Sequence, residues 1–251
     1  MKKTAILLLM IVLTAAVSAQ KIYDLVEKGN LNYMSGDYEL AIEEYQAVID
    51  SGYESPELYY NLGNAYYKSN KFTNALVNYE KAALLAPDDE DIQHNLEMAR
   101  QLVVDKIEKL PEFLPKIWYR QFIGLLKTDQ WALISMITFP ISLLLFLFYF
   151  FVRRIGIRKT AFLLALFIML VSASTFIFSY NQKKLVYNNS YAIIITPSVT
   201  IKSSPDESGT ELFQLHEGTK VEIIDQLGDW KEIKLSDGNV GWLKLSDLVR
   251  L

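Results

Sequence analysis

The chain has 251 residues, a formal net charge of −4 and no cysteine. The absence of cysteine excludes disulfides, a thiol nucleophile, a cysteine-ligated zinc site and a lipoprotein anchor. The charge is uneven: residues 21–111 carry 17 acids and 8 bases, residues 112–184 carry 2 acids and 9 bases, and residues 185–251 carry 10 acids and 6 bases. Acidic ends around a basic, apolar middle argue against a nucleic-acid partner and are typical of a membrane protein.

The N-terminus has the layout of a secretory signal. Lys2 and Lys3 precede an apolar stretch at residues 5–17, and small residues lead up to Ala19. This pattern predicts a signal peptide over residues 1–19. An uncleaved anchor is the alternative, although the apolar stretch is short for a membrane span. Either version exports the segment that follows.

The first part of the chain repeats itself at a fixed offset. Ala41 and Ala75, like Gly29 and Gly63, lie 34 residues apart, which is the period of a tetratricopeptide helix–turn–helix unit. The second copy fills all eight positions of that pattern, at Tyr59, Leu62, Gly63, Tyr66, Ala75, Tyr79, Ala82 and Pro87. The pattern predicts an all-α repeat domain in which glycine and alanine allow close helix contacts.

The predicted domain covers residues 20–110, with repeats at 22–55 and 56–89 and a polar capping helix at 90–110. The first repeat departs from the pattern, since Lys28 and Asn32 stand where Leu62 and Tyr66 stand in the second. Two repeats and a cap are short for an independent solenoid. We therefore expect support from residues 111–127, which belong to a juxtamembrane linker at 111–130, or from a partner.

The resemblance to tetratricopeptide proteins implies a peptide-binding groove on the first helix of each repeat. The groove residues it implies are Asn30, Tyr33, Tyr60, Asn61, Asn64 and Tyr67. Val26, Asp91 and Asn95 occupy positions where the co-chaperone subfamily carries cations, so capture of an acidic tail is not expected and a neutral or basic segment is favoured. The alternative is that these residues only pack the superhelix.

Two apolar windows follow, and each is long enough to cross a bilayer. Residues 131–152 and 160–180 contain no charged side chain, which predicts two transmembrane helices. The loop at 153–159 between them carries Arg153, Arg154, Arg158 and Lys159, and dense positive charge marks a cytoplasmic loop. We therefore predict a multi-pass protein of the bacterial inner (cytoplasmic) membrane, with both globular ends periplasmic. Neither span contains an acid, a base or a histidine that could serve transport.

The C-terminal part changes to short alternating strands separated by turn residues. Six strands are predicted, at 191–195, 199–202, 211–214, 220–226, 230–234 and 240–243, which indicates a small all-β barrel. Residues 190–251 resemble a bacterial SH3 domain, through residues 199–205, 215–218, 228–230 and 237–242. Trp230 and Trp242 form a candidate surface for a peptide or a cell-wall stem peptide, and a core role for both is the alternative.

The sequence offers no catalytic constellation. His94 and His216 lie in different modules without a nearby set of metal ligands, and no phosphate-binding loop or nucleophile elbow occurs. We therefore predict a non-enzymatic protein without a metal or cofactor.

The order of these modules is similar to that of the BatE family, the E members of the Bacteroides aerotolerance operon. The predicted fold class is a multi-domain membrane protein with all-α tetratricopeptide repeats, two transmembrane helices and an all-β SH3-like barrel. The resemblance implies a scaffold in an envelope complex linked to aerotolerance or oxidative-stress tolerance. Its implied partners are operon membrane proteins with von Willebrand A domains or tetratricopeptide repeats, besides the lipid bilayer. The alternative is a cell-wall sensor or tether whose barrel binds peptidoglycan.

Overall fold

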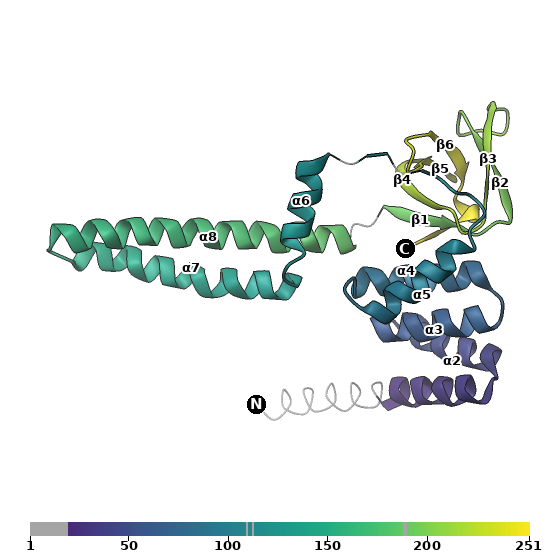
Figure 1. Cartoon of the computed structure of the whole chain (residues 1–251), viewed down its shortest axis with the longest axis horizontal. Coiled ribbons are helices and arrows are strands. Elements are labelled where there is room, and N and C mark those ends of the chain that lie inside the picture. The colour runs from purple at the N-terminus through teal and green to yellow at the C-terminus, as the bar shows by residue number, and fades with distance from the viewer. Residues whose placement is uncertain (1–19, 109, 112, 188–189) are drawn as a thin grey trace, which may run out of the picture. The chain divides into compact units, whose positions relative to one another are not determined.

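The structure, a computed structural model, describes residues 20–108, 110–111, 113–187 and 190–251 (Figure 1). The predicted signal peptide at 1–19 lies outside these residues. The described residues fall into two compact units. One unit combines the chain before Leu110 with the chain from Ser190 onward, and the other is the segment between them.

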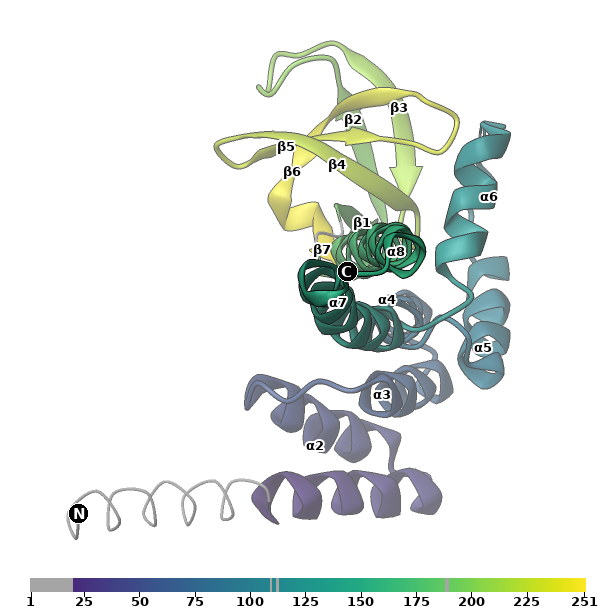
Figure 2. The same ribbon diagram turned by 90° about the vertical axis from the view of Figure 1, so that its left-hand side faces the viewer.

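The repeats form a stack of short antiparallel helices in chain order (Figure 2). Residues 20–35 are helical and are followed by α2 (Tyr38–Asp50), α3 (Pro56–Lys68), α4 (Phe72–Leu85) and α5 (Glu90–Gln101). Local chemistry sets the helix starts. The Ser55 side chain accepts from the backbone N–H of Leu58 at 3.1 Å, with Pro56 in the first turn, and the Asp89 carboxylate accepts from the N–H groups of Asp91 and Ile92.

A glycine and a tyrosine set the close contact within each repeat. A Cβ atom on Gly63 would lie 2.7 Å from the Tyr79 ring, and one on Gly29 would lie 2.6 Å from the Tyr45 ring. Both tyrosines are buried because their rings lie directly on the glycine backbone. The 34-residue pattern therefore reflects one steric requirement that is met twice.

The cap helix is shorter than the sequence indicated, because α5 ends at Gln101 and not at residue 110. Beyond it the chain is extended, and Val103, Asp105 and Ile107 are partly buried while their neighbours are exposed. Ile107 packs on the core of the barrel, and Asp105 hydrogen-bonds to it. Contacts with the barrel favour an extended segment over further helix.

The C-terminal part is one antiparallel sheet of seven strands in the order β3-β2-β6-β5-β4-β1-β7 (Figure 1). The strands are β1 (Tyr191–Ile194), β2 (Ser198–Lys202), β3 (Glu211–His216), β4 (Lys220–Leu227), β5 (Trp230–Lys234), β6 (Val240–Lys244) and β7 (Leu248–Arg250). A 3-10 turn at Leu245–Asp247 leads into β7, which the sequence did not indicate. The sheet encloses an aliphatic core that includes Ile201, Val221, Ile233 and Leu243.

Gly241 lies where β6 passes the core. A Cβ atom there would lie 2.4 Å from the Ile201 side chain and 3.0 Å from the Lys202 carbonyl oxygen. The glycine in the Val-Gly-Trp segment therefore allows β2 and β6 to approach.

The second unit is a helical hairpin with a short helix before it. It contains α6 (Leu114–Ile123), α7 (Thr128–Phe151) and α8 (Ile155–Tyr187), so the segment expected as a linker at 111–130 includes a helix and the start of α7. Helices α7 and α8 are long and apolar enough to cross a membrane, with mean hydropathies of 2.2 and 2.5 in their most apolar windows. Only 11% and 22% of those windows are buried, unlike the core helices of a soluble protein.

Hydroxyl groups join the two long helices. The Ser135 hydroxyl donates to the Ser172 carbonyl at 3.0 Å, and the Ser172 hydroxyl donates to the Ser135 carbonyl at 3.2 Å. Small side chains at these positions let the backbones approach, and the exchanged hydrogen bonds satisfy both buried hydroxyls.

We expect Gly63→Val to destabilise the repeats, because its side chain would enter the space of the Tyr79 ring. Overpacking of this kind costs about 1–3 kcal/mol, which should lower the thermal midpoint by about 4 °C or more. Thermal unfolding of the full chain, followed by circular dichroism, measures the shift. Gly156→Val is the control, since a Cβ atom there meets no other atom within 4 Å. Equal midpoints for the two variants would contradict the assigned repeat register.

Candidate functional site

The asparagines predicted for the groove are held by the buried tyrosines. The Tyr45 hydroxyl donates to Asn30 Oδ1 and the Tyr79 hydroxyl donates to Asn64 Oδ1, each at 2.7 Å. The two pairs occupy equivalent positions in successive repeats. The packing that buries each tyrosine therefore also fixes the side-chain amide of an asparagine on the neighbouring helix.

The hydrogen bonds of the predicted groove residues continue onto the cap helix through Asn95, which stands at one of the positions where the co-chaperone subfamily carries cations. Asn95 Nδ2 donates to Asn64 Oδ1 at 2.9 Å and to the Tyr60 hydroxyl oxygen at 3.0 Å. Asn61 Nδ2 lies 3.5 Å from Asn30 Oδ1. These contacts join Asn30 to Asn61, and they join Tyr60 and Asn64 through Asn95. A repeat signal for Asn95 was present, since it stands 34 residues after Asn61.

Tyr33 and Tyr67 form a second pair of equivalent positions. The Tyr33 ring packs edge-on against Tyr38, with 5.4 Å between centroids, and the Tyr67 ring packs in the same way against Phe72 at 5.3 Å. Both are partly buried and close the turn between the two helices of their repeat. They border the groove and also have a packing role.

The tyrosines of this region keep their protons at neutral pH. Burial raises the pKa of the Tyr45 phenol to about 12, and burial also raises the pKa values of Tyr33 and Tyr79. Phenol hydroxyls therefore act as hydrogen-bond donors to the asparagines. The resulting surface is uncharged, with amide and phenol groups suited to a peptide backbone.

On the barrel, the two tryptophans lie on the outer face of the sheet. Both are only partly buried, and neither belongs to the aliphatic core cluster. Trp242 pairs with Glu232 and Lys202, while Trp230 pairs with Lys244 across the strands. Their partial exposure favours the candidate surface over the alternative of a core role for both.

Charged groups surround Trp230. The Nζ atoms of Lys202 and Lys244 lie 5.9 and 5.7 Å from the Trp230 ring centroid. Both lysines contact the Glu207 carboxylate, at 3.4 and 2.5 Å, and this ion pairing raises the pKa of Lys244. The outer face thus combines aromatic rings with charges of both signs.

The repeats and the barrel pack against each other along a contact that we call the seam, formed by α4, residues 103–107 and the barrel. Ile193 of β1 belongs to the same apolar cluster as Leu76 of α4, with Val249 packed beside it. Gly218, which has a φ of +86°, lies close to Val103, because a Cβ atom there would be 3.0 Å from that side chain. The support expected from residues 111–127 or from a partner is supplied here by the barrel.

Asp105 is the centre of the polar part of the seam. Its Oδ2 atom accepts from the His216 backbone N–H at 2.7 Å and from the Thr219 hydroxyl at 2.6 Å, and its Oδ1 lies 2.9 Å from His216 Nδ1. Burial opposes ionisation of Asp105, but hydrogen bonds from Thr219 and His216 prevail and lower its pKa. The carboxylate is therefore held in its charged form.

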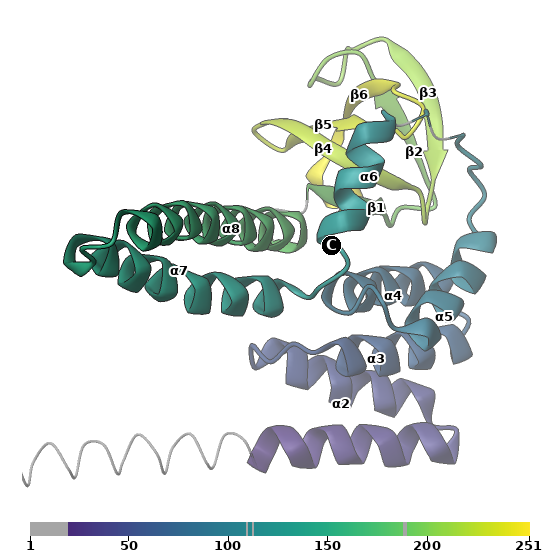
Figure 3. The ribbon, with the colours of Figure 1, turned by 60° about the vertical axis from the view of Figure 1, so that its left-hand side comes forward.

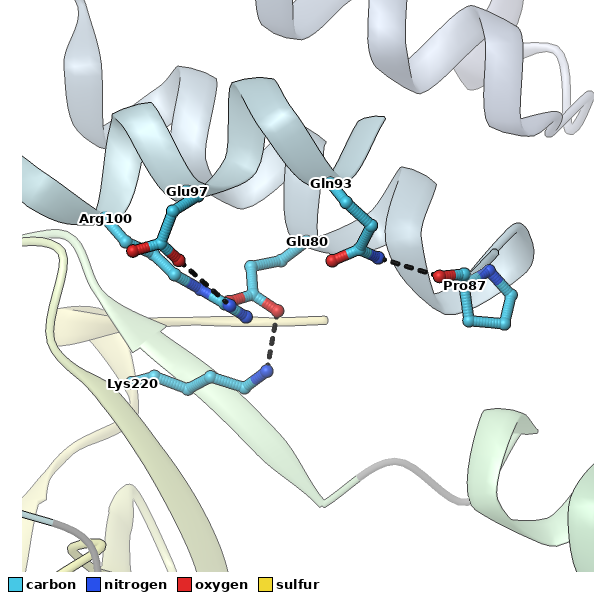
Figure 4. A network of polar contacts seen from close by, with 6 residues as sticks. All are labelled: Glu80, Pro87, Gln93, Glu97, Arg100 and Lys220. Atoms are coloured by element: carbon cyan, nitrogen blue, oxygen red, sulfur yellow. Dashed lines mark hydrogen bonds and ion pairs between the residues drawn. The ribbon is translucent and has the colours of Figure 1, made fainter. Parts of the chain in front are cut away.

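The Glu80 side chain on α4 links this helix to α5 and to β4 (Figure 4). Its side chain is almost completely buried, with Oε1 accepting from Arg100 at 2.8 Å and Oε2 accepting from Lys220 at 2.6 Å. Arg100 lies on α5 and Lys220 begins β4, so the carboxylate joins the cap helix to the barrel. Removal of one partner from such a buried pair is strongly destabilising.

No group of three or more potential ligands that could hold a metal ion occurs within the described ranges. His216 lies at the seam, and His94 lies on α5. The predicted absence of a metal, cofactor or catalytic site stays a prediction.

Comparison with known families identifies both modules. A model of the tetratricopeptide repeat matches residues 56–89, a TPR repeat model matches residues 29–70, and a bacterial SH3 domain model matches residues 197–249. No curated protein matches the chain. A solved NlpC/P60 family protein from Bacillus cereus ATCC 10987 is similar over 28% of this chain, at 18% identity and a TM-score of 0.21. The match spans 23% of that protein's chain.

These matches confirm the predicted fold class of tetratricopeptide helices, two long apolar helices and a C-terminal SH3-like sheet. The two modules fit protein–protein interaction for the repeats and peptidoglycan binding for the barrel. Solenoid repeats present an extended concave surface for such contacts.

The lowered pKa of Asp105 predicts that the seam weakens in acid. Its stabilising contribution is fully present above the ordinary carboxyl pKa of 3.8 and is lost as the pH falls through the lower folded pKa. Hydrogen exchange at the His216 amide, corrected for the intrinsic rate, should therefore increase below that range in the native chain. Asp105→Asn should remove this pH dependence, whereas Glu108→Gln on the same segment should retain it. Unchanged protection of His216 in acid would contradict the assignment.

Proposed function

We propose that this chain is a non-enzymatic, membrane-anchored scaffold that holds a partner protein in its extracytoplasmic tetratricopeptide groove. The observation that carries this proposal is the repeated tyrosine–asparagine geometry. Buried hydroxyls orient Asn30 and Asn64, and Asn95 extends the same arrangement to the cap helix. Oriented amides can bind a peptide backbone at a small entropic cost, because they are already ordered in the free protein.

The composition of the groove favours a neutral or basic partner segment. Tyr60 supplies a flat amphipathic side chain of the kind enriched at binding hot spots, beside the neutral amides of Asn61 and Asn64. The surrounding repeat region is acidic, with 17 acids against 8 bases over residues 21–111. An acidic segment would meet this charge unfavourably.

The proposed topology places both ends of the chain outside the cytoplasm, with the basic loop around Arg153 and Arg154 inside. This topology is supported by the fact that the compact first unit is built from two separate segments of the chain. Residues before Leu110 and residues after Ser190 pack together through the Asp105–His216 contact, and α7 and α8 lie between them in sequence. Two segments that pack together must be on the same side of a membrane, so an even number of crossings is required.

The module order resembles the BatE family, which supports a role in an envelope complex related to aerotolerance or oxidative-stress tolerance. The proposed partners are membrane proteins of the same operon that carry von Willebrand A domains or tetratricopeptide repeats. The bacterial inner membrane, with periplasmic modules, is the proposed location.

We expect Asn61→Arg to abolish or greatly reduce partner co-purification without unfolding the protein. Within the described part of the chain, the Asn61 side chain makes one long hydrogen bond, the 3.5 Å contact to Asn30, so a larger side chain there blocks the groove at little structural cost. Asn64 is a poorer choice, because its loss would leave the buried Tyr79 hydroxyl without its acceptor. The measurement is quantitative mass spectrometry of material purified from mild detergent.

Gln101→Arg is the matched control, since it makes the same change of an exposed amide at the end of α5. Thermal midpoints of both variants should equal that of the native chain. Full partner recovery with Asn61→Arg would refute the groove proposal.

A second candidate function is a cell-wall tether, which the outer face of the barrel favours. Trp230 and Trp242 are accessible there with lysines and Glu207 beside them. Aromatic rings can stack on sugar or peptide groups of the wall, and the charges can pair with amino and carboxyl groups of stem peptides.

If the barrel is a tether, sedimentation of the full chain with purified peptidoglycan should fall with Trp230→Ala and Trp242→Ala together. The outer position of both rings predicts little change in folding, because the aliphatic core is left intact. Ile224→Ala on β4 is a control for loss of an exposed apolar side chain at a position that pairs with neither tryptophan. Binding that persists in the double variant excludes this face as the wall site.

A further inference from the structure

The short helix α6 presents an apolar stripe that the proposed scaffold role leaves unexplained. Leu114, Trp118 and Phe122 are spaced four residues apart, so they lie along one side of the helix. Trp118 is 65% exposed and Leu114 is 62% exposed. Phe113 and Leu125, just outside the helix, extend the exposed apolar surface at both ends.

Hydrogen bonds hold α6 across one end of the α7–α8 hairpin (Figure 3). The Trp131 indole Nε1 donates to the Ile123 carbonyl at 2.8 Å, which joins the end of α6 to the first turn of α7. Asn181 Nδ2 donates to the Tyr119 hydroxyl at 2.7 Å, which joins α6 to α8. The helix therefore has a fixed place relative to both long helices.

An aromatic cluster reinforces this position. Phe178 of α8 packs edge-on against Trp131, Phe122 and Tyr119, with centroid separations of 5.2, 5.6 and 6.1 Å. Trp131 and Ile123 are buried by these contacts, while Trp118 remains outside the cluster. Leu114 and Trp118 therefore lie outside the contact with the hairpin, while Phe122 lies at its edge and stays 50% exposed.

We propose that α6 is an interfacial helix whose Leu114–Trp118–Phe122 stripe inserts into the boundary between phospholipid head groups and acyl chains. The proposal rests on the membrane anchoring proposed above. Trp131 and Tyr180 mark the ends of the two apolar windows, where aromatic side chains lie at the level of the head groups. Because α6 is bonded to Trp131 and to Asn181, it lies at that same level.

The charge pattern fits a phospholipid surface. Residues 113–128 contain Lys116, Arg120 and Lys127 and no acid. On a helix, positions 116 and 120 project away from the Trp118 stripe, as in amphipathic helices that lie in the plane of a bilayer with cations toward the phosphates.

Single-cysteine variants test the proposal directly, because the chain has no native cysteine. Full-length Trp118→Cys and Lys116→Cys are labelled with an environment-sensitive fluorophore and placed in vesicles of phosphatidylethanolamine and phosphatidylglycerol. The label at 118 should lose most of its emission to a nitroxide on the upper acyl chain and resist aqueous iodide. The label at 116 should show the reverse preference.

Two further positions separate failure of this proposal from failure of membrane anchoring. Leu144→Cys reports on the middle of α7, and Lys234→Cys reports on the exposed surface of the barrel. A lipid response at 144 with an aqueous response at 118 overturns the interfacial helix and leaves anchoring intact. An aqueous response at 144 overturns anchoring and this proposal together. A label at 118 that is protected from both quenchers indicates a protein contact and overturns the lipid assignment.

Discussion

The placement of Tyr79 on Gly63 is the contact on which most of the first unit depends. The ring lies against a backbone without a side chain, so α3 and α4 can approach closely. Its hydroxyl then orients Asn64, which in turn accepts from Asn95 on the cap helix. The adjacent face of α4 carries Leu76 and Glu80 to the barrel. The Tyr79 ring therefore sets the spacing of α3 and α4 and orients Asn64, and the helix that carries it also contacts the barrel at the seam.

The same contact explains why the groove residues differ in their roles. Asn64 and Tyr60 are part of the hydrogen-bond network that stabilises the repeats, so their loss affects folding as well as binding. Asn61 lies beside this network with one long contact. A substitution at Asn61 can therefore weaken binding without lowering stability, whereas a substitution at Asn64 affects both. Only positions like Asn61 can be used to test recognition by itself.

The repeats and the barrel strands were accessible to sequence analysis because their signals are steric and local. Gly63, Ala75 and the turn glycines tolerate few replacements at their positions, and the repeat period makes them visible. The seam gave no such signal, since Asp105 and Glu80 look like ordinary surface acids until the barrel supplies His216 and Lys220. The early end of α5 was not predicted for the same reason, because the extended segment after it is stabilised by residues more than a hundred positions away. The outer placement of Trp230 also depends on how the sheet curves.

The discontinuous first unit has a consequence for the order of events during synthesis. Asp105 and His216 are separated by 111 residues, with the whole helical hairpin between them. The repeats leave the ribosome first. At that stage Leu76 and Glu80 of α4, which contact the barrel in the folded protein, are still exposed. Their contacts with the barrel can form only after the hairpin has been synthesised and the barrel has emerged. For that interval the nascent repeats lack the surface that covers them in the folded protein, and a segment made after the hairpin completes the first unit.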